Sequence, residues 1–295
     1  MWRSRGDAIR LAIVSCALLS VAPAIAKEEL RDAPWRDTEI EYEHSLALIG
    51  NDGMFVYGHR LDLRPSVHLG YWLELKARFL VVQDLYGTPP ADNSLRPSNL
   101  LLALATPGVT EPFSGIKISG GIHVILPTSK AAQTETLIFG AGPSVEVSRT
   151  FPLLEGVTVG YRGRWTWDLN KYTTSTECSG MDCTSLLSLN NWAMLAHGPF
   201  LRFSPLRKLA LEASLLFVNA FLSRESTSIP DSVSWQLFKV SVGYQVVDAL
   251  RISVGVCNEG NDVLPETSMD FSSTRSFVRV FLSLTFTPDA LIRGF

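Results

Sequence analysis

The chain has 295 residues, 46% of them hydrophobic, and a formal net charge of −3. This acidic balance argues against nucleic acid as a partner, and the length suits one large β-domain or two small ones. The mean hydropathy of +0.15 is high for a soluble secreted protein, and a lipid-facing exterior would explain the surplus.

The first 26 residues are predicted to be a cleaved signal peptide. Three arginines stand within the first ten residues, residues 11–21 are apolar, and residues 24–26 (Ala-Ile-Ala) supply a cleavage site. A lipoprotein signal through Cys16 is disfavoured because almost no apolar region precedes it. Cleavage removes three arginines and one aspartate, which changes the formal charge from −3 to −5. No later stretch approaches the length of a membrane-spanning helix.

Residues 59–71 (HRLDLRPSVHLGY) alternate between polar and apolar side chains. Successive side chains of a β-strand point to opposite faces, so this segment has one charged and one apolar face. In a soluble sheet the charged face meets water and the apolar face a core. In a transmembrane β-barrel the apolar face meets lipid and the charged face lines the lumen.

The alternation recurs along the chain and predicts about twelve strands of roughly ten residues, the length that crosses a bilayer at a tilt. It is clear in 115–126, 157–169, 236–246, 250–257 and 275–286, and weaker in 39–49, 77–86, 134–149, 191–203 and 209–223, while 98–106 is apolar without clear alternation.

The connections between these strands alternate in length. Short or intermediate ones fall at 72–76, 107–114, 150–156, 204–208 and 246–249, and longer polar ones at 87–97, 127–133, 171–190, 224–233 and 258–272. Outer-membrane barrels have this asymmetry, with tight periplasmic turns and longer extracellular loops. A soluble sandwich has no reason to keep it.

In these patterns the chain resembles the Gram-negative outer-membrane β-barrel class. The resemblance implies an all-β fold, a closed antiparallel up-and-down transmembrane β-barrel of about twelve strands in the cell outer membrane, with its N-terminus in the periplasm. The expected organisation is a signal peptide (1–26), a periplasmic lead-in (27–38), the barrel (39–287) and a C-terminal tail (288–295). Pro288 interrupts the last alternation, so the final strand is expected to stop near Phe286.

If alternation sets orientation, the lumen carries about two cations for each anion. The residues expected to line it and to set selectivity are Arg60, Arg64, His68, Lys117, His123, Arg162, Arg164, Asp168, Lys239, Arg251 and Arg279; the same faces also carry Arg78, Arg202, Arg275, Glu41, Glu43, Asp62, Glu146 and Glu212. A positive lumen concentrates anions. The alternative is a closed barrel filled by ion pairs such as Arg60–Asp62 and Arg164–Asp168.

The cysteines fit an oxidising compartment. Cys178 and Cys183 enclose four residues of a polar stretch, and we expect a disulfide-closed loop there; a metal site that includes Asp182 is disfavoured because no nearby histidine completes it. Cys257 is expected to be a free buried thiol.

The sequence therefore predicts a non-enzymatic channel for passive passage of small polar or anionic solutes, without cofactor or metal. The expected partners are outer-membrane lipid, the barrel assembly machinery and small solutes, with a monomer favoured. Three alternatives remain: a non-conducting structural or surface-interaction barrel, an outer-membrane lipid hydrolase that uses His68 or His123, and a soluble periplasmic β-protein.

Overall fold

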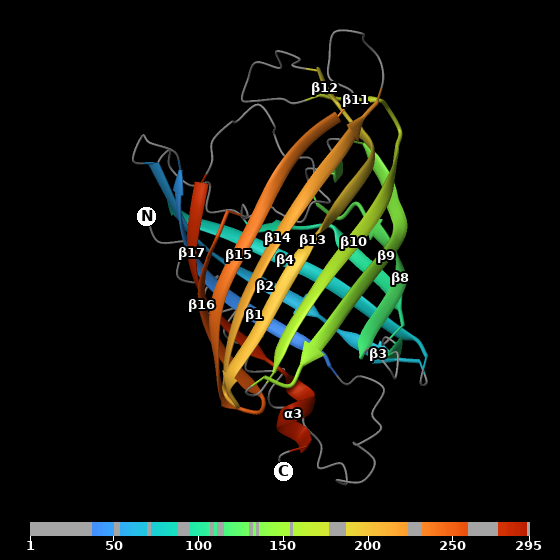
Figure 1. Cartoon of the computed structure of the whole chain (residues 1–295). Helices are drawn as coiled ribbons and strands as arrows, with labels where there is room; N and C mark the ends of the chain where they lie inside the picture. Colours follow the sequence, from blue (N-terminus) through green and yellow to red (C-terminus); the bar gives the residue numbers. More distant parts are fainter. Residues whose placement is uncertain are drawn as a thin grey trace.

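The computed structural model is a closed antiparallel β-barrel of twelve strands (Figure 1). It describes residues 37–49, 54–69, 72–87, 95–106, 109–110, 115–129, 132–133, 136–153, 156–176, 187–223, 232–258 and 277–293. The predicted fold class and strand number are confirmed. The signal peptide and the Cys178–Cys183 loop lie outside the described residues.

Twelve strands form the wall of the barrel. They are β1 (Glu39–Ile49), β2 (Met54–Arg64), β4 (Glu74–Gly87), β6 (Leu100–Ala105), β8 (Ile116–Leu126), β9 (Leu137–Phe151), β10 (Val157–Asn170), β13 (Asn191–Leu206), β14 (Leu209–Leu222), β15 (Ser232–Val247), β16 (Leu250–Cys257) and β17 (Phe277–Phe286). Three short strands extend the wall, namely β3 (Ser66–His68), β5 (Leu95–Pro97) and β7 (Val109–Thr110). β11 (Thr174–Thr176) and β12 (Leu187–Leu189) pair in a separate two-stranded sheet, and the helix α3 (Pro288–Arg293) follows β17.

Each wall strand pairs with its neighbour in the chain, and the first and last strands pair with each other. β1 and β17 run antiparallel with Ile40 opposite Phe286 and Ile49 opposite Phe277. This pairing leaves no open sheet edge, which a sheet in lipid requires because an exposed edge would present unpaired backbone groups. Within the described residues, no helix has the length and hydropathy to cross a membrane.

The predicted strands agree with the observed ones to within a few residues, with one correction. Residues 59–71 were expected to form one strand, but β2 already begins at Met54, Pro65 separates it from β3, and β3 ends at His68. Proline has no N–H to donate to a sheet. The carbonyl of Pro65 still accepts a hydrogen bond from the N–H of Ala77 (2.9 Å). The last strand stops at Phe286, as expected.

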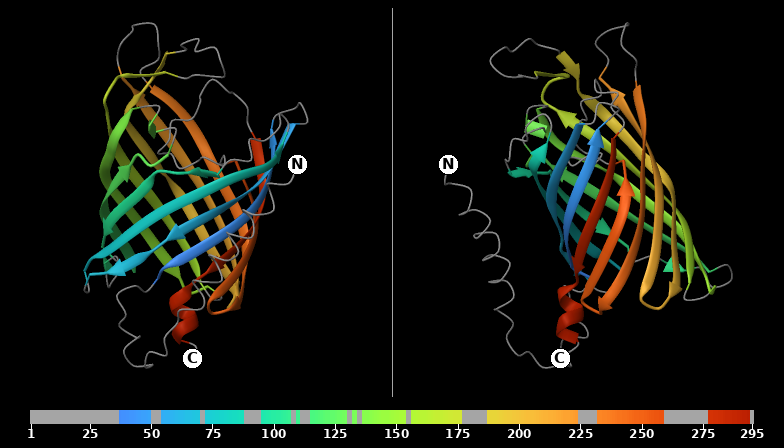
Figure 2. Two further views of the ribbon diagram at one scale, coloured as in Figure 1. Left: turned by 180° about the vertical axis from the view of Figure 1, so that it is seen from behind. Right: turned by 90° about the vertical axis from the view of Figure 1, so that its left-hand side faces the viewer.

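The turns sort to the two ends of the barrel as their lengths predicted. Tight turns at 207–208 and 248–249 join β13 to β14 and β15 to β16 at the end where α3 lies, and the β11–β12 hairpin extends the opposite end (Figures 1 and 2). α3 begins directly after β17, and the N–H of Thr287 bonds to the carbonyl of Ala249 in the neighbouring turn (2.9 Å).

The barrel's exterior is apolar over its middle. On the adjacent strands β15, β16 and β17 the outward positions are held by exposed aliphatic side chains, namely Val240, Val242, Ile252, Val254, Val278, Val280, Leu282 and Leu284. Trp165, Trp167, Trp192 and Phe221 form an aromatic cluster near the end opposite α3, where β10, β13 and β14 meet. An aliphatic belt with aromatic residues at its rim is the exterior of a transmembrane barrel.

Glycines on inward positions let large side chains lie flat against the wall. A Cβ at Gly160 would stand 2.3 Å from the ring of Phe200, and one at Gly255 would stand 2.5 Å from the ring of Phe281. Both rings occupy the space that the glycines leave. The inward aromatic side chains therefore line the lumen instead of crossing it.

Candidate functional site: the barrel lumen

One side of the lumen is filled by a buried ion cluster around Glu43. Arg60 of β2 lies directly opposite Glu43 of β1, and its guanidinium is 2.9 Å from the carboxylate. Arg279 of β17 approaches the other oxygen of Glu43 at 3.5 Å, and its Nε lies 3.4 Å from the Sγ of Cys257. Glu43 is 0% exposed. Cys257 is free and buried, as predicted.

A second cluster centres on Asp62, which is also 0% exposed. Arg64 and Arg78 each approach Asp62 Oδ2 at 2.7 Å, and Arg64 also reaches Glu41 at 2.7 Å. The expected Arg60–Asp62 pair is therefore wrong. Arg60 lies directly opposite Glu43 across the strands and pairs with it, while both Arg64 and Arg78 hold Asp62.

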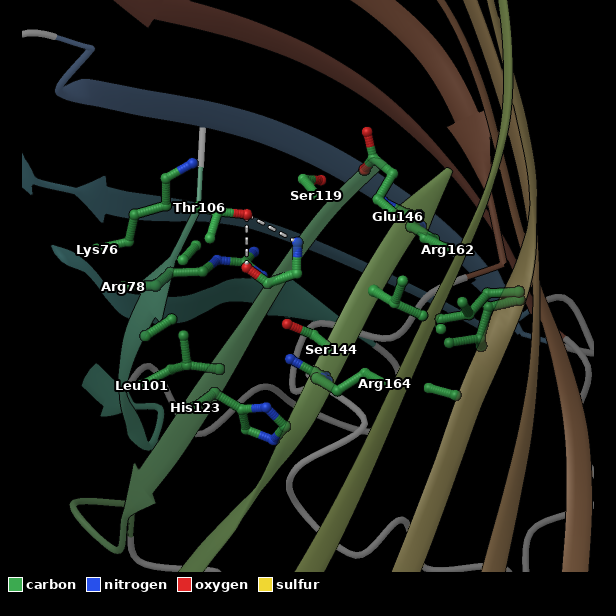
Figure 3. A pocket seen from close by; sticks show the side chains of 18 residues that line it. Lys76, Arg78, Leu101, Thr106, Ser119, His123, Ser144, Glu146, Arg162 and Arg164 are labelled. Carbon is green, nitrogen blue, oxygen red and sulfur yellow. Dashed lines mark hydrogen bonds between the residues drawn. The ribbon is translucent and has the colours of Figure 1, made fainter. Parts of the chain in front are cut away.

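The opposite side of the lumen is hollow. A cavity of about 390 Å³, called here the upper cavity, is lined mainly by β4, β6, β8, β9 and β10, with single residues from β13, β14 and β15 (Figure 3). Its charged lining is Lys76, Arg78, Arg162, Arg164 and Glu146, with His123 beside them. Its apolar lining is Leu101, Ala103, Ala105, Val145, Ala196, Leu216 and Leu237.

A second cavity of about 500 Å³, called here the lower cavity, lies nearer the α3 end. Its charged lining is Arg64, Lys117, Arg162, Arg202, Lys239, Glu146 and Glu212, and its hydroxyl lining is Ser148, Thr150, Thr158, Ser214 and Ser241. Arg162 and Glu146 line both cavities, and they face each other on paired strands β10 and β9. The two cavities therefore adjoin at this pair.

The charge of this hollow is strongly positive. Counting Arg162 once, the two cavities together present eight Lys and Arg side chains and two carboxylates, Glu146 and Glu212. Buried acids behind the surface neutralise part of this charge at Arg64 and Arg78. The remaining excess creates a potential that attracts anions and repels cations.

Six of the eleven predicted lumen residues line the two cavities: Arg64, Lys117, His123, Arg162, Arg164 and Lys239. Arg60 and Arg279 belong to the buried Glu43 cluster. Arg251 crosses the face of Gly243 and donates to Glu212 at 3.0 Å. The Asp168 carboxylate lies against Gly140. His68 lies at the α3 end, 3.1 Å from Asp37. Arg275 lies outside the described residues.

The sequence did not predict that Lys76 and much of the apolar lining face the lumen. Lys76 was expected in a turn, but β4 begins at Glu74 and points Lys76 inward together with Arg78. Extending the alternation backwards from Arg78 would have found it. The inward Leu216 gave no such signal, because β14 (LALEASLLFVNAFL) is apolar on both faces along most of its length.

The two histidines weighed as catalytic candidates have other partners. His123 Nε2 lies 2.9 Å from Thr166 Oγ1. His68 faces Asp37 and Glu74, three side chains whose ligand atoms lie within 4.8 Å of one another. The Glu74 carboxylate is already used, since it accepts from Ser66 at 2.6 Å and lies 2.8 Å from Lys76. Among the described residues, neither histidine is hydrogen-bonded to a serine hydroxyl.

Comparison with solved structures finds an outer-membrane barrel of similar fold. The COG4313 outer membrane channel from Pseudomonas putida F1 superposes with a TM-score of 0.54 at 12% identity, over 90% of this chain and 99% of that one. At this identity the likeness shows a shared fold.

Two further barrels superpose less well. OmpF from Salmonella typhi (6% identity, 85% of this chain and 96% of that one) and the NalP translocator domain from Neisseria meningitidis (8%, 95% and 96%) each give a TM-score of 0.42 and add nothing to the fold assignment. No protein-family model matches the sequence, and no curated protein is similar to it.

Proposed function

We propose that this protein is an outer-membrane channel through which small anions pass passively. The observation that carries the proposal is the charge of the two adjoining cavities, eight cationic side chains against two carboxylates. The closed barrel with an aliphatic exterior supports a location in a bilayer. The likeness in fold to an outer-membrane channel supports the same class of function.

The cationic side chains of the two cavities are spread along the lumen. β10, β8 and β13 present Arg164, Arg162, Lys117 and Arg202 in successive register positions toward the α3 end. The β1, β2 and β17 side, where Glu43 and Asp62 each lie between two arginines, acts as the fixed wall opposite. An anion that enters meets cationic side chains at each height, and a cation meets the same charges as a barrier.

The same buried clusters favour a second candidate, a non-conducting barrel. Glu43, Arg60, Arg279 and Asp62 fill the space on their side and would not move for a solute. If the two cavities do not connect to both ends, the molecule is a closed structural barrel whose loops meet an external partner.

Proteoliposome swelling separates the two candidates. We expect vesicles that contain the refolded protein to swell faster in an anionic sugar acid than in a neutral sugar of equal size, and slowest in a cationic amino sugar. Vesicles that swell in none of the three would establish the closed barrel. Equal rates for all three would contradict anion selectivity.

A further inference from the structure

The two cavities differ in the chemistry of their walls, and the lower one is richer in hydroxyl groups. Five hydroxyl side chains line it in addition to its Lys and Arg residues, namely Ser148, Thr150, Thr158, Ser214 and Ser241. Only two of these hydroxyls are bonded to each other, with Thr150 Oγ1 and Thr158 Oγ1 at 2.9 Å. The upper cavity has three hydroxyl side chains, Thr106, Ser119 and Ser144, beside seven aliphatic ones.

The five cations of the lower cavity differ in what holds them, and Lys239 lies over the ring of Phe281 at 4.8 Å. Arg64 and Arg202 are held by acids, Arg64 by Asp62 at 2.7 Å and Arg202 by Glu212 at 3.0 Å. Within the part of the chain that the structure describes, Lys117 and Arg162 form no ion pair. Their charges and N–H groups are therefore directed to what enters the cavity.

The space around these donors is kept open by Gly160. A Cβ at this position would stand 2.3 Å from the ring of Phe200, so only glycine lets the ring lie along the wall of β10. Phe200 lines the lower cavity in this flat position. All donors stand on paired strands, which fixes their relative positions before a ligand arrives.

We propose that the lower cavity is a binding subsite for multivalent oxyanions, of which inorganic phosphate is the simplest, with Lys117 and Arg162 as its principal charged donors. The inference rests on the proposed channel function and names the solutes that the channel prefers. A tetrahedral oxyanion offers several oxygen acceptors and two negative charges, so it uses both cations and the surrounding hydroxyls at once. Chloride has a single charge and no such arrangement of acceptors.

The position of Arg162 gives the subsite its place in transport. Because Arg162 also lines the upper cavity, its guanidinium is available to an anion on either side of the junction. Glu146 stands beside it as the acid common to both cavities. Where one cavity leads into the other, Arg162 attracts an oxyanion and Glu146 repels it. The binding is therefore weak enough for a bound oxyanion to be released.

The test is phosphate block of the chloride current through single channels in a planar bilayer. We expect added phosphate to reduce the wild-type current in a saturable way. Arg162→Gln and Lys117→Gln should each raise the half-blocking concentration by about tenfold, the loss expected for one charge-assisted hydrogen bond. The matched control is Arg149→Gln, which should block like wild type because Arg149 on β9 faces outward and stacks on Phe151 at 4.9 Å.

A second readout does not depend on conduction. Phosphate should raise the thermal unfolding midpoint of wild type and Arg149→Gln in detergent, and should raise it less in Arg162→Gln and Lys117→Gln. A channel that carries chloride without phosphate block or phosphate stabilisation would overturn the subsite and leave the channel function standing. A protein that phosphate stabilises through Arg162 but that never conducts would uphold the subsite and overturn the channel.

Discussion

Glu43 is the residue on which the buried side of the lumen most depends. It is fully buried between two guanidinium groups, that of Arg60 at 2.9 Å and that of Arg279 at 3.5 Å. Burying a charge is costly unless an opposite charge and hydrogen bonds compensate for it. One carboxylate here compensates for two buried cations, so its loss affects three strands.

Replacing Glu43 should destabilise the barrel strongly. We expect Glu43→Gln to lower the free energy of unfolding by about 3–5 kcal/mol, because it leaves two buried guanidinium groups without their counter-charge. Urea titration of the protein refolded in lipid vesicles measures the change. The control is Glu39→Gln, where a half-exposed acid shares Arg64 with two others and the loss should be about 0–1 kcal/mol. Equal losses in both variants would contradict the cluster's role.

Two glycines, Gly142 on β9 and Gly198 on β13, lie very close to the backbone of the next strand. A Cβ at Gly142 would stand 1.8 Å from the carbonyl oxygen of Trp165, and one at Gly198 would stand 1.9 Å from that of Leu215. Both carbonyl oxygens belong to the backbone of a paired strand, so they cannot relieve the clash by a change of rotamer as a side chain can. The glycines are thus required for the pairing of β9 with β10 and of β13 with β14.

Gly142→Ala tests this close approach. The added methyl group should force β9 from β10 and lower the free energy of unfolding by about 3 kcal/mol, the upper end for overpacked sites. The same urea titration measures it. Gly120→Ala on the neighbouring strand β8 is the matched control, because its Cβ would meet its nearest neighbour, the Ser144 carbonyl oxygen, at an ordinary 3.7 Å. A Gly142→Ala protein as stable as this control would refute the account of the β9–β10 contact.

The sequence predicted the strands well because a barrel wall imposes a period of two on each of them. That period identified β1 as 39–49 and β16 as 250–257 without error. It could not show that β14 is apolar inside as well as outside, since alternation vanishes when both faces carry the same side chains. It also could not show the partner of Arg60, because the register of two strands sets which residues meet.

At the scale of the whole molecule, net charge and lumen charge have opposite signs. The chain carries a formal charge of −3, yet the two cavities present eight cations and two carboxylates. The net charge counts every charged side chain of the protein, whereas a solute in the lumen meets only those that face inward. The sign of the lumen therefore had to come from the alternation of individual strands, which assigned Lys117, Arg162 and Arg164 to one face.

The reversal potential of the refolded protein in a planar bilayer under a KCl gradient tests the central claim most directly. An anion-selective lumen predicts a stable current that reverses near the equilibrium potential of chloride. Arg162→Glu should move the reversal potential toward that of potassium, because it exchanges the cation common to both cavities for an acid. A reversal potential at that of potassium in the wild type, or a protein that inserts and never conducts, would contradict the account.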